Sequence, residues 1–356
     1  MINHIHLENF KSIRTLDLAL EPITIIIGAN GAGKSNFISF FKLADRLFRR
    51  SFQDYVAEQA GADNLLYFGL KNSNSLSFSI EFDSKNRYYC HLKPNTEGGL
   101  YIETEGTQFH HGFPGWDTVE LGKSYNESQL INQQYGRYAY VKEYLNSFKV
   151  YHFHDTGSSA GIKQKKNLDD NESLRGDAEN LAAFLYYLQE KHHTQFLKIE
   201  RMIRSVAPFF DKFLLKPDRT REDLIRLEWK EKGSDMYLNA THLSDGTLRF
   251  MALATLLMQP QPPKTIVIDE PELGLHPFAI AKLAGLIRQA SLQSQIVVST
   301  QSVSLVDSFE PENIVTVDRS GGQSVFKRLQ SDALAGWMQE YSLGELWNKN
   351  VIGAKP

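Results

Sequence analysis

Apolar and polar positions alternate along the first part of the chain in a way that is typical of β-strands. Polar residues separate Ile5 from Leu7, the same spacing returns over residues 13–20, and residues 23–27 are apolar at four of five positions. Alternation predicts a half-buried strand, whereas a nearly continuous apolar run predicts a strand covered on both faces. Three strands are therefore expected at the start of the chain, followed by a helix from 34 to about 50.

The middle of the chain carries further strand-like and helix-like stretches. The alternation in residues 75–107 predicts antiparallel strands joined by polar turns, and residues 108–125 are expected to form an irregular loop. Helical periodicity runs from 178 to about 206, and residues 155–166 are expected to form a polar, mobile loop. The adjacent aromatic residues Phe209–Phe210 are expected to lie in the core.

Composition limits the classes of protein to which the chain can belong. With 356 residues, 42% of them hydrophobic, it can bury a large core in one big domain or two ordinary ones. A formal net charge of −3 argues against a strongly basic nucleic-acid sheath, so DNA contacts would need local patches or a partner. The single cysteine, Cys90, excludes an internal disulfide and fits a reducing compartment. No signal peptide and no membrane-spanning run are visible, so a cytoplasmic protein without membrane contact is expected.

A glycine-rich stretch, residues 28–35, follows directly after the apolar run and satisfies the pattern G-x-x-x-x-G-K-[ST]. A strand that leads through such a loop into a helix stacks backbone N–H groups around a polyphosphate. The glycines permit positive φ angles and a close approach of the backbone to phosphate. The residues expected to hold the triphosphate are Asn30, Gly31, Ala32, Gly33 and Lys34, and the Ser35 hydroxyl is expected to bind Mg²⁺.

A second motif, which is acidic, lies about 235 residues after the phosphate loop, at the end of the strand predicted over residues 264–270. Asp269 at the carboxyl end of that strand can hold the Mg²⁺ that Ser35 also holds. Glu270 can orient or deprotonate the water that attacks the γ-phosphate. Together with the phosphate loop, this pair of acids predicts Mg²⁺-dependent hydrolysis of ATP, with Lys34 assisting at the phosphates.

Residues 243–247, Leu-Ser-Asp-Gly-Thr, open a helix, and an N-cap at Ser244 or Asp245 is by itself a sufficient explanation for them. Yet the order of phosphate loop, Leu-Ser-Asp-Gly helix, acidic strand and Pro-Glu-Leu-Gly-Leu-His-Pro at 271–277 resembles the ABC-type ATPase heads of the SMC and RecF class. The resemblance is closest to the stand-alone AAA-family ATPases related to the OLD family. It implies an α/β P-loop NTPase, an ABC-type head with an antiparallel β subdomain and a helical lobe.

The resemblance also implies roles for individual residues. Ser244 and Gly246 would close on the ATP held by a second copy, so that a homodimer or higher oligomer forms around two ATP molecules. Lys11 would contact nucleotide, Asn36 would line the phosphates with Asn30, and residues 273–276 would reach across the dimer. Two positions depart from the family pattern. Gln301, a further candidate catalytic residue, stands where many heads place a switch histidine. It can donate to a phosphate oxygen but cannot change charge near neutral pH, which favours slow hydrolysis. The usual Q-loop glutamine is missing, and His154 and Asp155 occupy about its place.

The expected organisation is a nucleotide-binding lobe of residues 1–155 and 262–330, a mostly helical lobe of 156–261 and a C-terminal tail of 331–356. OLD-type nucleases carry a TOPRIM domain after the ATPase, and the tail is too short for one. The resemblance therefore implies a separately encoded effector, a TOPRIM-like nuclease or another protein, in bacterial anti-phage defence or DNA maintenance. Two alternatives stay open: a nucleotide-gated scaffold with little turnover, and a RecF-like DNA repair clamp.

Overall fold

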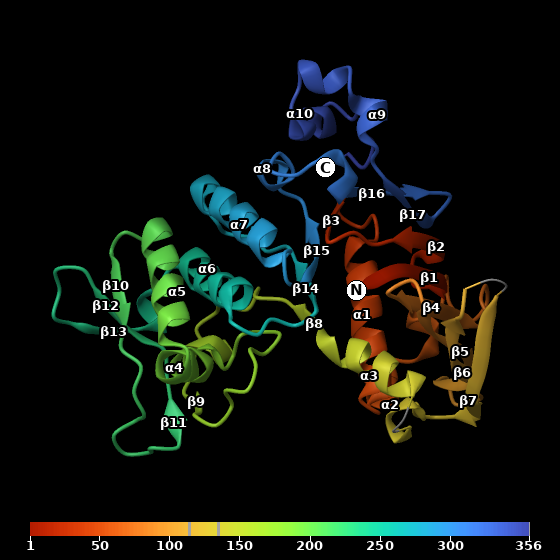
Figure 1. Ribbon diagram of the computed structural model, residues 1–356, viewed down its shortest axis with the longest axis horizontal. Helices are drawn as coiled ribbons and strands as arrows, with labels where there is room; N and C mark the ends of the chain where they lie inside the picture. Colours follow the sequence, from red (N-terminus) through yellow and green to blue (C-terminus); the bar gives the residue numbers. More distant parts are fainter. Residues whose placement is uncertain (113–114, 134–135, 356) are drawn as a thin grey trace.

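The computed structural model describes residues 1–112, 115–133 and 136–355. Within these residues the chain forms a central six-stranded sheet and a second six-stranded sheet packed beside it (Figure 1). The central sheet has the order β17-β16-β3-β15-β14-β8, and its strands are parallel except for β17. They are β3 (Ile23–Ile27), β8 (Phe148–Tyr151), β14 (Thr265–Asp269), β15 (Gln295–Thr300), β16 (Ile314–Ser320) and β17 (Gln323–Arg328).

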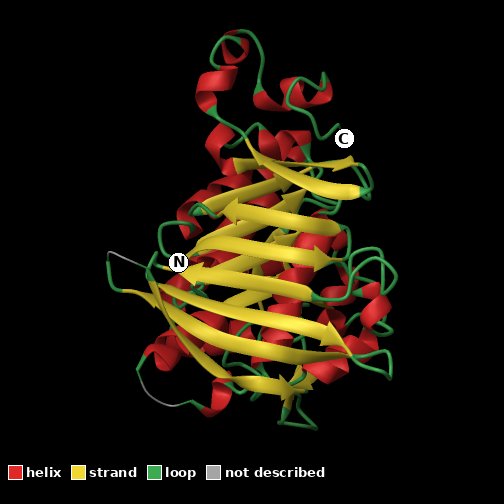
Figure 2. Cartoon of the chain, turned by 90° about the vertical axis from the view of Figure 1, so that its right-hand side faces the viewer, coloured by secondary structure: helices red, strands yellow, loops and turns green. Residues whose placement is uncertain are grey.

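The second sheet is antiparallel throughout, in the order β2-β1-β4-β5-β6-β7, and faces the viewer in Figure 2 with the helices behind it. Its strands are β1 (Ile2–Phe10), β2 (Ile13–Ala19), β4 (Leu76–Phe82), β5 (Asn86–Pro94), β6 (Leu100–His110) and β7 (Trp116–Tyr125). The irregular loop expected at 108–125 is therefore wrong: β6 runs into this region and β7 occupies most of it. Because β7 is an edge strand whose side chains are mostly exposed or half-buried, its sequence lacks a clear alternation. Residues 113–114 of that expectation lie outside the described residues.

Helix α1 (Lys34–Phe48) lies between the two sheets and packs against both of them. Phe40 meets Phe10 and Phe78 of the antiparallel sheet edge-on, with ring centroids 6.3 and 5.2 Å apart. Phe41 meets Phe148 of the central sheet at 5.9 Å. Helices α2 (Phe52–Glu58) and α3 (Arg137–Ser147) close this core at one end. The phosphate-loop helix is therefore fixed by apolar packing on both of its faces.

On the other side of the central sheet lie helices α4 to α7, with α6 and α7 nearer to the strands and α4 and α5 outside them (Figure 1). These are α4 (Leu181–Lys191), α5 (His193–Val206), α6 (Asp245–Met258) and α7 (Pro277–Ala290). One continuous helix over 178–206 is wrong, because His192 leaves the helical region with φ −134° and ψ 47°. The break allows the apolar faces of both α4 and α5 to reach the same core. Small strands complete this part: β9 (Lys166–Asn167), β10 (Phe210–Phe213), β11 (Leu224–Ile225), β12 (Glu228–Glu231) and β13 (Tyr237–Asn239).

Two further expectations for this region need correction. The segment 155–166 is not a purely polar loop, because Ala160 and Ile162 are buried in the core beneath it. Phe210 is fully buried as expected, whereas Phe209 is 41% exposed. Both rings pack on Trp229, at 5.7 and 6.1 Å between ring centroids, but only that of Phe210 belongs to the buried core.

The C-terminal segment forms α9 (Ser331–Leu334) and α10 (Leu343–Asn348), which project at the top of Figure 1. Helix α10 packs against α8 (Val303–Val306). Trp347 is fully buried there, and its indole N–H donates to the carbonyl oxygen of Ala354 at 2.5 Å. Across the described residues, we find no helix with the length and apolar content needed to span a bilayer.

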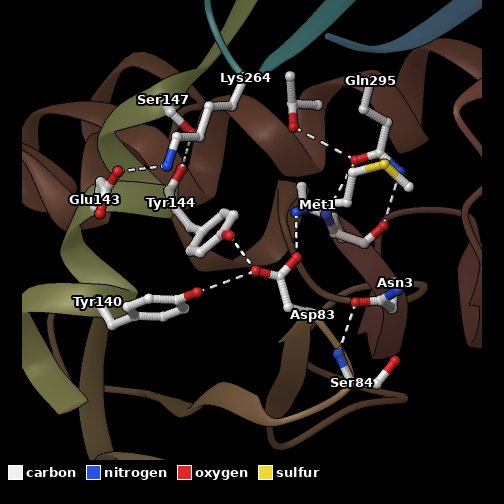
Figure 3. Close-up of polar contacts among 12 residues, drawn as sticks. Met1, Asn3, Asp83, Ser84, Tyr140, Glu143, Tyr144, Ser147, Lys264 and Gln295 are labelled. Atoms are coloured by element: carbon white, nitrogen blue, oxygen red, sulfur yellow. Dashed lines mark hydrogen bonds and ion pairs between the residues drawn. The ribbon is translucent and has the colours of Figure 1, made fainter. Parts of the chain in front are cut away.

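A polar network joins the antiparallel sheet to α3 and to the start of β14 (Figure 3). Asp83 accepts a hydrogen bond from the Tyr144 hydroxyl and pairs with the amino group of Met1 at 2.5 Å. On the other side of α3, Glu143 pairs with Lys264, whose ammonium group also lies 4.7 Å from the centroid of the Tyr144 ring. Because Lys264 directly precedes β14, the network helps to fix the strand that carries Asp269.

Candidate functional site

The candidate site lies where three parallel strands of the central sheet end. Strand β15 is flanked by β3 on one side and β14 on the other, and all three run in the same direction. The segments that leave their carboxyl ends are the phosphate loop, Gln301 and the Asp269–Glu270 pair. In open parallel sheets, ligands bind outside the carboxyl ends of the strands. The fold thus brings the phosphate loop of residues 28–35 together with residues 269, 270 and 301.

The phosphate loop has the backbone that its glycines predict. Gly31 and Gly33 have φ angles of +75° and +121°, which residues with a Cβ rarely adopt. A Cβ at Gly33 would lie 2.0 Å from Oγ of Ser324. Asn30 and Ser35 are exposed, so their side chains are accessible to a ligand. Helix α1 begins at Lys34, and its N-terminus presents the free N–H groups that attract anions.

The hairpin of β16 and β17, at the edge of the sheet next to β3, holds this loop in place. Ser324 of β17 donates to the carbonyl oxygen of Ala32 at 2.5 Å and lies 2.7 Å from the Ser12 hydroxyl. Ser12 in turn accepts from Nδ2 of Asn36 at 2.7 Å. Arg319 donates to the carbonyl oxygen of Gly31 at 3.1 Å. Asn36, which is expected to line the phosphates, thus also belongs to the set of contacts that fixes the loop.

Lys34 is buried beneath the loop and faces the acids of β14. Its ammonium group donates to the carbonyl oxygens of Gly28 and Ala29 at 2.6 and 3.0 Å. Burial lowers the pKa of Lys34, although the nearby carboxylates of Glu270 and Asp269 oppose this shift. The loop therefore presents a cation within the electrostatic reach of the two acids. A hydroxyl from Ser35 and a carboxylate from Asp269 are oxygen donors of the kind that Mg²⁺ prefers, so the residues fit this metal.

Asp269 is oriented by side chains of both neighbouring strands. Ser299 of β15 donates to one carboxylate oxygen at 2.5 Å, and Nδ1 of His152, just after β8, lies 3.5 Å from the other. Burial acts to raise the pKa of Asp269, but the hydrogen bonds from His152 and Ser299 outweigh it and hold the pKa below its ordinary value. The ring of His154 contacts the backbone carbonyl of Asp269 at 3.1 Å. Both His152 and His154 therefore contact Asp269. They lie in the region where a Q-loop glutamine is expected.

Glu270 stands in a strained and well-defined position. Its φ angle is +43°, which is unusual for a residue with a side chain. Gln301 donates through Nε2 to Oε1 of Glu270 at 2.5 Å. Glu272 in turn accepts from the backbone N–H of Gln301 at 2.9 Å and from the Thr300 hydroxyl at 2.6 Å. The end of β15 thus holds both glutamates of the Asp-Glu-Pro-Glu segment.

The Leu-Ser-Asp-Gly turn forms the N-terminus of α6, as the N-cap interpretation predicts. The Ser244 hydroxyl accepts from the N–H of Thr247 at 3.2 Å, and Ser244 itself is exposed. A Cβ at Gly246 would lie 2.2 Å from the carbonyl oxygen of Gly274, so only glycine allows the turn to pack this closely. The tip of α6 and the loop at 271–276 therefore lie side by side.

Lys11 lies away from the acids, beside a pocket next to the phosphate loop. Its ammonium group donates to Oε1 of Gln59 at 3.0 Å, and burial lowers the pKa of Lys11. The pocket has a volume of about 710 Å³ and is also lined by Asn36, Phe68 and Arg319. Phe68 is 52% exposed, so part of its ring is accessible in this pocket.

The residues that hold the motifs in place have no recognisable pattern in the sequence. Ser12, Ser324, His152 and Arg249 have ordinary sequence contexts, and each acts through a neighbour that only the fold brings near. Among the described residues, no cluster of three or more His, Cys, Asp or Glu side chains could hold a metal by itself. A metal at Asp269 would therefore need further ligands from the nucleotide or from water.

Comparison with solved structures supports an ABC-type head. An SMC head bound to the C-terminal winged-helix domain of ScpA matches with a TM-score of 0.63 and 16% sequence identity, over 93% of this chain and 99% of that one. The Smc head domain with an extended coiled coil bound to the C-terminal domain of ScpA, derived from Pyrococcus furiosus, matches with a TM-score of 0.58 and 15% identity, over 95% of this chain and 98% of that one. At these identities the likeness shows the fold alone. No curated protein sequence matches the chain at a significant level.

The sequence matches a protein family, which the likeness in fold alone does not identify. A family model described as "AAA domain, putative AbiEii toxin, Type IV TA system" matches residues 23–307, which is most of the chain. The match begins at β3, before the phosphate loop, and ends after Gln301, so it includes every motif of the site. Sequence family and fold agree, and the chain belongs to this family of ABC-type AAA ATPases.

Proposed function

We propose that this protein binds ATP with Mg²⁺ at the carboxyl ends of β3, β15 and β14 and hydrolyses it. The observation that carries the proposal is the convergence of Lys34 with Asp269 and Glu270, because phosphoryl transfer needs a cation and a base on opposite sides of the γ-phosphate. The loop N–H groups and Lys34 would hold the phosphates, with Ser35 and Asp269 as ligands of Mg²⁺. When bound, Mg²⁺ neutralises charge on the phosphate oxygens. Glu270, oriented by Gln301, would take a proton from the attacking water.

The pocket beside Lys11 would hold the ribose and base. It is continuous with the phosphate loop through Asn36 and Arg319, and its volume of about 710 Å³ is suited to a small ligand. The half-exposed ring of Phe68 offers an apolar face on which a base can stack. Lys11, which lines the same pocket, would also contact the nucleotide.

We further propose that ATP joins two copies head to tail. Ser244 is exposed at the tip of α6, where a helix N-terminus favours an anion, and among the described residues its hydroxyl bonds only to the backbone N–H and the hydroxyl of Thr247 in the same helix. Leu273 and Phe278, 47% and 52% exposed, lie on the segment next to this tip. Exposed apolar side chains around a polar tip favour contact with another protein surface. In this arrangement Ser244 and Gly246 would complete the phosphate site of the second copy.

The test uses three purified variants. We expect Glu270→Gln to lower phosphate release at least about 100-fold while retaining ATP binding, since it removes the base alone. In light scattering, this variant should double its mass on addition of ATP and Mg²⁺. Ser244→Arg should bind ATP and remain a monomer, whereas Ser205→Arg, an exposed serine of α5 in the same lobe, should behave as wild type. Unchanged phosphate release by Glu270→Gln would contradict the catalytic proposal. A monomeric Glu270→Gln protein with ATP would contradict the dimer.

A second candidate function is a nucleotide-gated scaffold with little turnover, and Gln301 is the observation that favours it. Gln301 holds Glu270 but cannot accept and release a proton near neutral pH. Such a scaffold would show the ATP-dependent dimer with wild-type protein as well as with Glu270→Gln. Slow phosphate release that is insensitive to Glu270→Gln would favour the scaffold over the enzyme.

The wider role we propose is control of a separately encoded effector, a TOPRIM-like nuclease or another protein, in anti-phage defence. The family description names a toxin of a type IV TA system, which supports a role in a defence system. Solved heads of this fold were crystallised with a domain of another protein, which supports a protein partner. The alternative of a RecF-like clamp predicts salt-dependent binding of DNA by this chain alone, and a binding titration at two salt concentrations separates the two.

A further inference from the structure

Arg249, one turn inside α6, is a buried cation with an unusual set of partners. Arg249 is only 5% exposed to solvent. Among the described residues, no carboxylate lies within ion-pair distance of its guanidinium group, and those of Asp245 and Glu272 act on it only from farther away. It donates instead to backbone carbonyl oxygens: that of Phe153 at 2.8 Å, that of His154 at 3.4 Å and that of Leu273. One side chain thus joins three segments that are far apart in the sequence.

Two of these segments touch the catalytic acids of the same copy. The His154 ring contacts the backbone carbonyl of Asp269 at 3.1 Å. Leu273 follows Glu272, which accepts from the backbone N–H of Gln301 at 2.9 Å, and Gln301 holds Glu270. Arg249 is therefore connected to both Asp269 and Glu270 by short chains of hydrogen bonds. The third segment is α6 itself, whose first residues carry Ser244.

A buried guanidinium group loses much of its stabilisation when its donors are left unpaired. The carbonyl oxygens of Phe153 and Leu273 must therefore keep their positions relative to α6, or the charge stays buried without partners. Close packing of Gly246 against Gly274 adds a steric restraint to the polar one. A displacement of the segments around Asp269 or Glu270 should thus move the tip of α6 with it.

From these contacts we infer that Arg249 is a positioning residue that couples the two ATP sites of the dimer. The inference rests on the proposed head-to-tail dimer, in which Ser244 serves the ATP of the second copy. ATP bound in one copy acts on Asp269 and Glu270, and Arg249 transmits the resulting shift to the α6 tip that completes the partner's site. The first ATP then prepares the second site, so that binding and hydrolysis are cooperative.

The first test measures cooperativity in Arg249 variants. Wild-type hydrolysis should rise with ATP concentration with a Hill coefficient between about 1.5 and 2, the limit for two coupled sites. Arg249→Lys keeps the charge but cannot reach carbonyls on two segments, and Arg249→Met removes the charge. Both should bring the coefficient to about 1, while the affinity of the monomer for a fluorescent ATP analogue stays within about threefold of wild type. Arg288→Met is the matched control, because Arg288 also donates to a backbone carbonyl, that of Ser308, but on α7. Wild-type cooperativity in both Arg249 variants would overturn the inference.

A second test needs no substitution at Arg249 and separates failure of the inference from failure of the dimer. The Ser244→Arg protein, shown to be monomeric by light scattering, is followed by hydrogen–deuterium exchange with and without ATP and Mg²⁺. ATP should slow exchange at the first-turn amides of α6, residues 245–249, in this monomer. In the Arg249→Met background the same amides should show no response to ATP. If the monomer binds ATP and α6 exchange is unchanged, the coupling is absent, whether or not wild-type protein forms a dimer.

Discussion

Gln301 donates through Nε2 to Oε1 of Glu270 at a distance of 2.5 Å, and the two residues leave adjacent parallel strands. A free carboxylate at a strand end can take several rotamers, whereas this one accepts from the side-chain amide of Gln301, whose backbone N–H is in turn held by Glu272. The amide holds Glu270 in one orientation without competing for a proton. In the proposed mechanism, Gln301 orients Glu270, the proposed base, in place of a switch histidine.

Substitution of Gln301 by alanine should therefore reduce turnover without removing ATP binding. We expect kcat to fall by about 10- to 100-fold, less than the loss for the base itself, and KM for ATP to stay within about threefold. Steady-state phosphate release at several ATP concentrations measures both parameters. Gln293→Ala, at an exposed glutamine after α7, controls for the loss of an amide. A large rise in KM with unchanged kcat would instead place Gln301 in ground-state binding of ATP.

The phosphate loop offers a comparison between two glycines. Gly31→Ala and Gly33→Ala both place a side chain at positive φ, which costs about 1–2 kcal/mol of the free energy of unfolding. Only Gly33→Ala adds a collision, with Ser324 at 2.0 Å, whereas a Cβ at Gly31 meets nothing within 4 Å. We expect Gly33→Ala to lose binding of a fluorescent ATP analogue and to unfold at lower denaturant than Gly31→Ala. Equal losses for the two variants would mean that the contact with Ser324 does not restrain the loop.

Sequence patterns predicted the parts of the fold whose residues are buried on a regular face. The run at 23–27 becomes β3, and the alternation of 75–107 becomes strands of the antiparallel sheet, because burial imposes a period on both. Strand β7 was missed for the opposite reason. It lies at the edge of its sheet, where its side chains are exposed or only partly buried. Its extended conformation is held by pairing with β6, which the local sequence does not encode.

The same distinction applies to the candidate site. The phosphate loop and Asp269–Glu270 could be recognised from the sequence. The residues of each motif act on the same phosphate group or metal ion, so they must stand at fixed, short spacings along the chain. The contacts of Ser324 with the loop and of His152 with Asp269 join residues more than 100 positions apart. They depend on strand order, with β8 next to β14 and the β16–β17 hairpin beside β3. Strand order is a property of the whole fold, so no local pattern announces these residues.

The network in Figure 3 allows a stability measurement at a distance from the site. Tyr144→Phe removes the hydroxyl that donates to Asp83 but keeps the ring, which stacks on Phe82 at 5.1 Å. We expect it to lower the free energy of unfolding by about 1 kcal/mol. Tyr140→Phe is the control, because its hydroxyl reaches Asp83 at a longer distance of 3.3 Å and the residue is 43% exposed, so its loss should be smaller. Denaturant titration of the three proteins gives the comparison, and equal losses would contradict a dominant role of Tyr144.

Glu272 should make the protein less stable as pH rises. Burial raises the pKa of Glu272 above its ordinary value, although the hydrogen bond from Thr300 opposes this shift. One of its carboxylate oxygens, Oε2, is buried without a partner among the described residues. Since the native pKa lies above that of the unfolded chain, the native state holds the proton more tightly, and stability is lost as pH rises from the ordinary carboxyl range to the native pKa.

Glu272→Gln removes the charge and keeps an oxygen that can accept from Thr300. At pH 8 we expect this variant to be more stable than wild type by about 1–2 kcal/mol, the usual cost of a poorly paired buried group, and the gain should shrink toward pH 4.5. Denaturant unfolding at a series of pH values measures it. Glu190→Gln, at an exposed end of α4, shows the effect of removing one negative charge from the surface. A gain at Glu272 that does not change with pH would mean that the benefit comes from packing of the amide, and a loss at pH 8 would mean that the buried charge is stabilised by partners of its own.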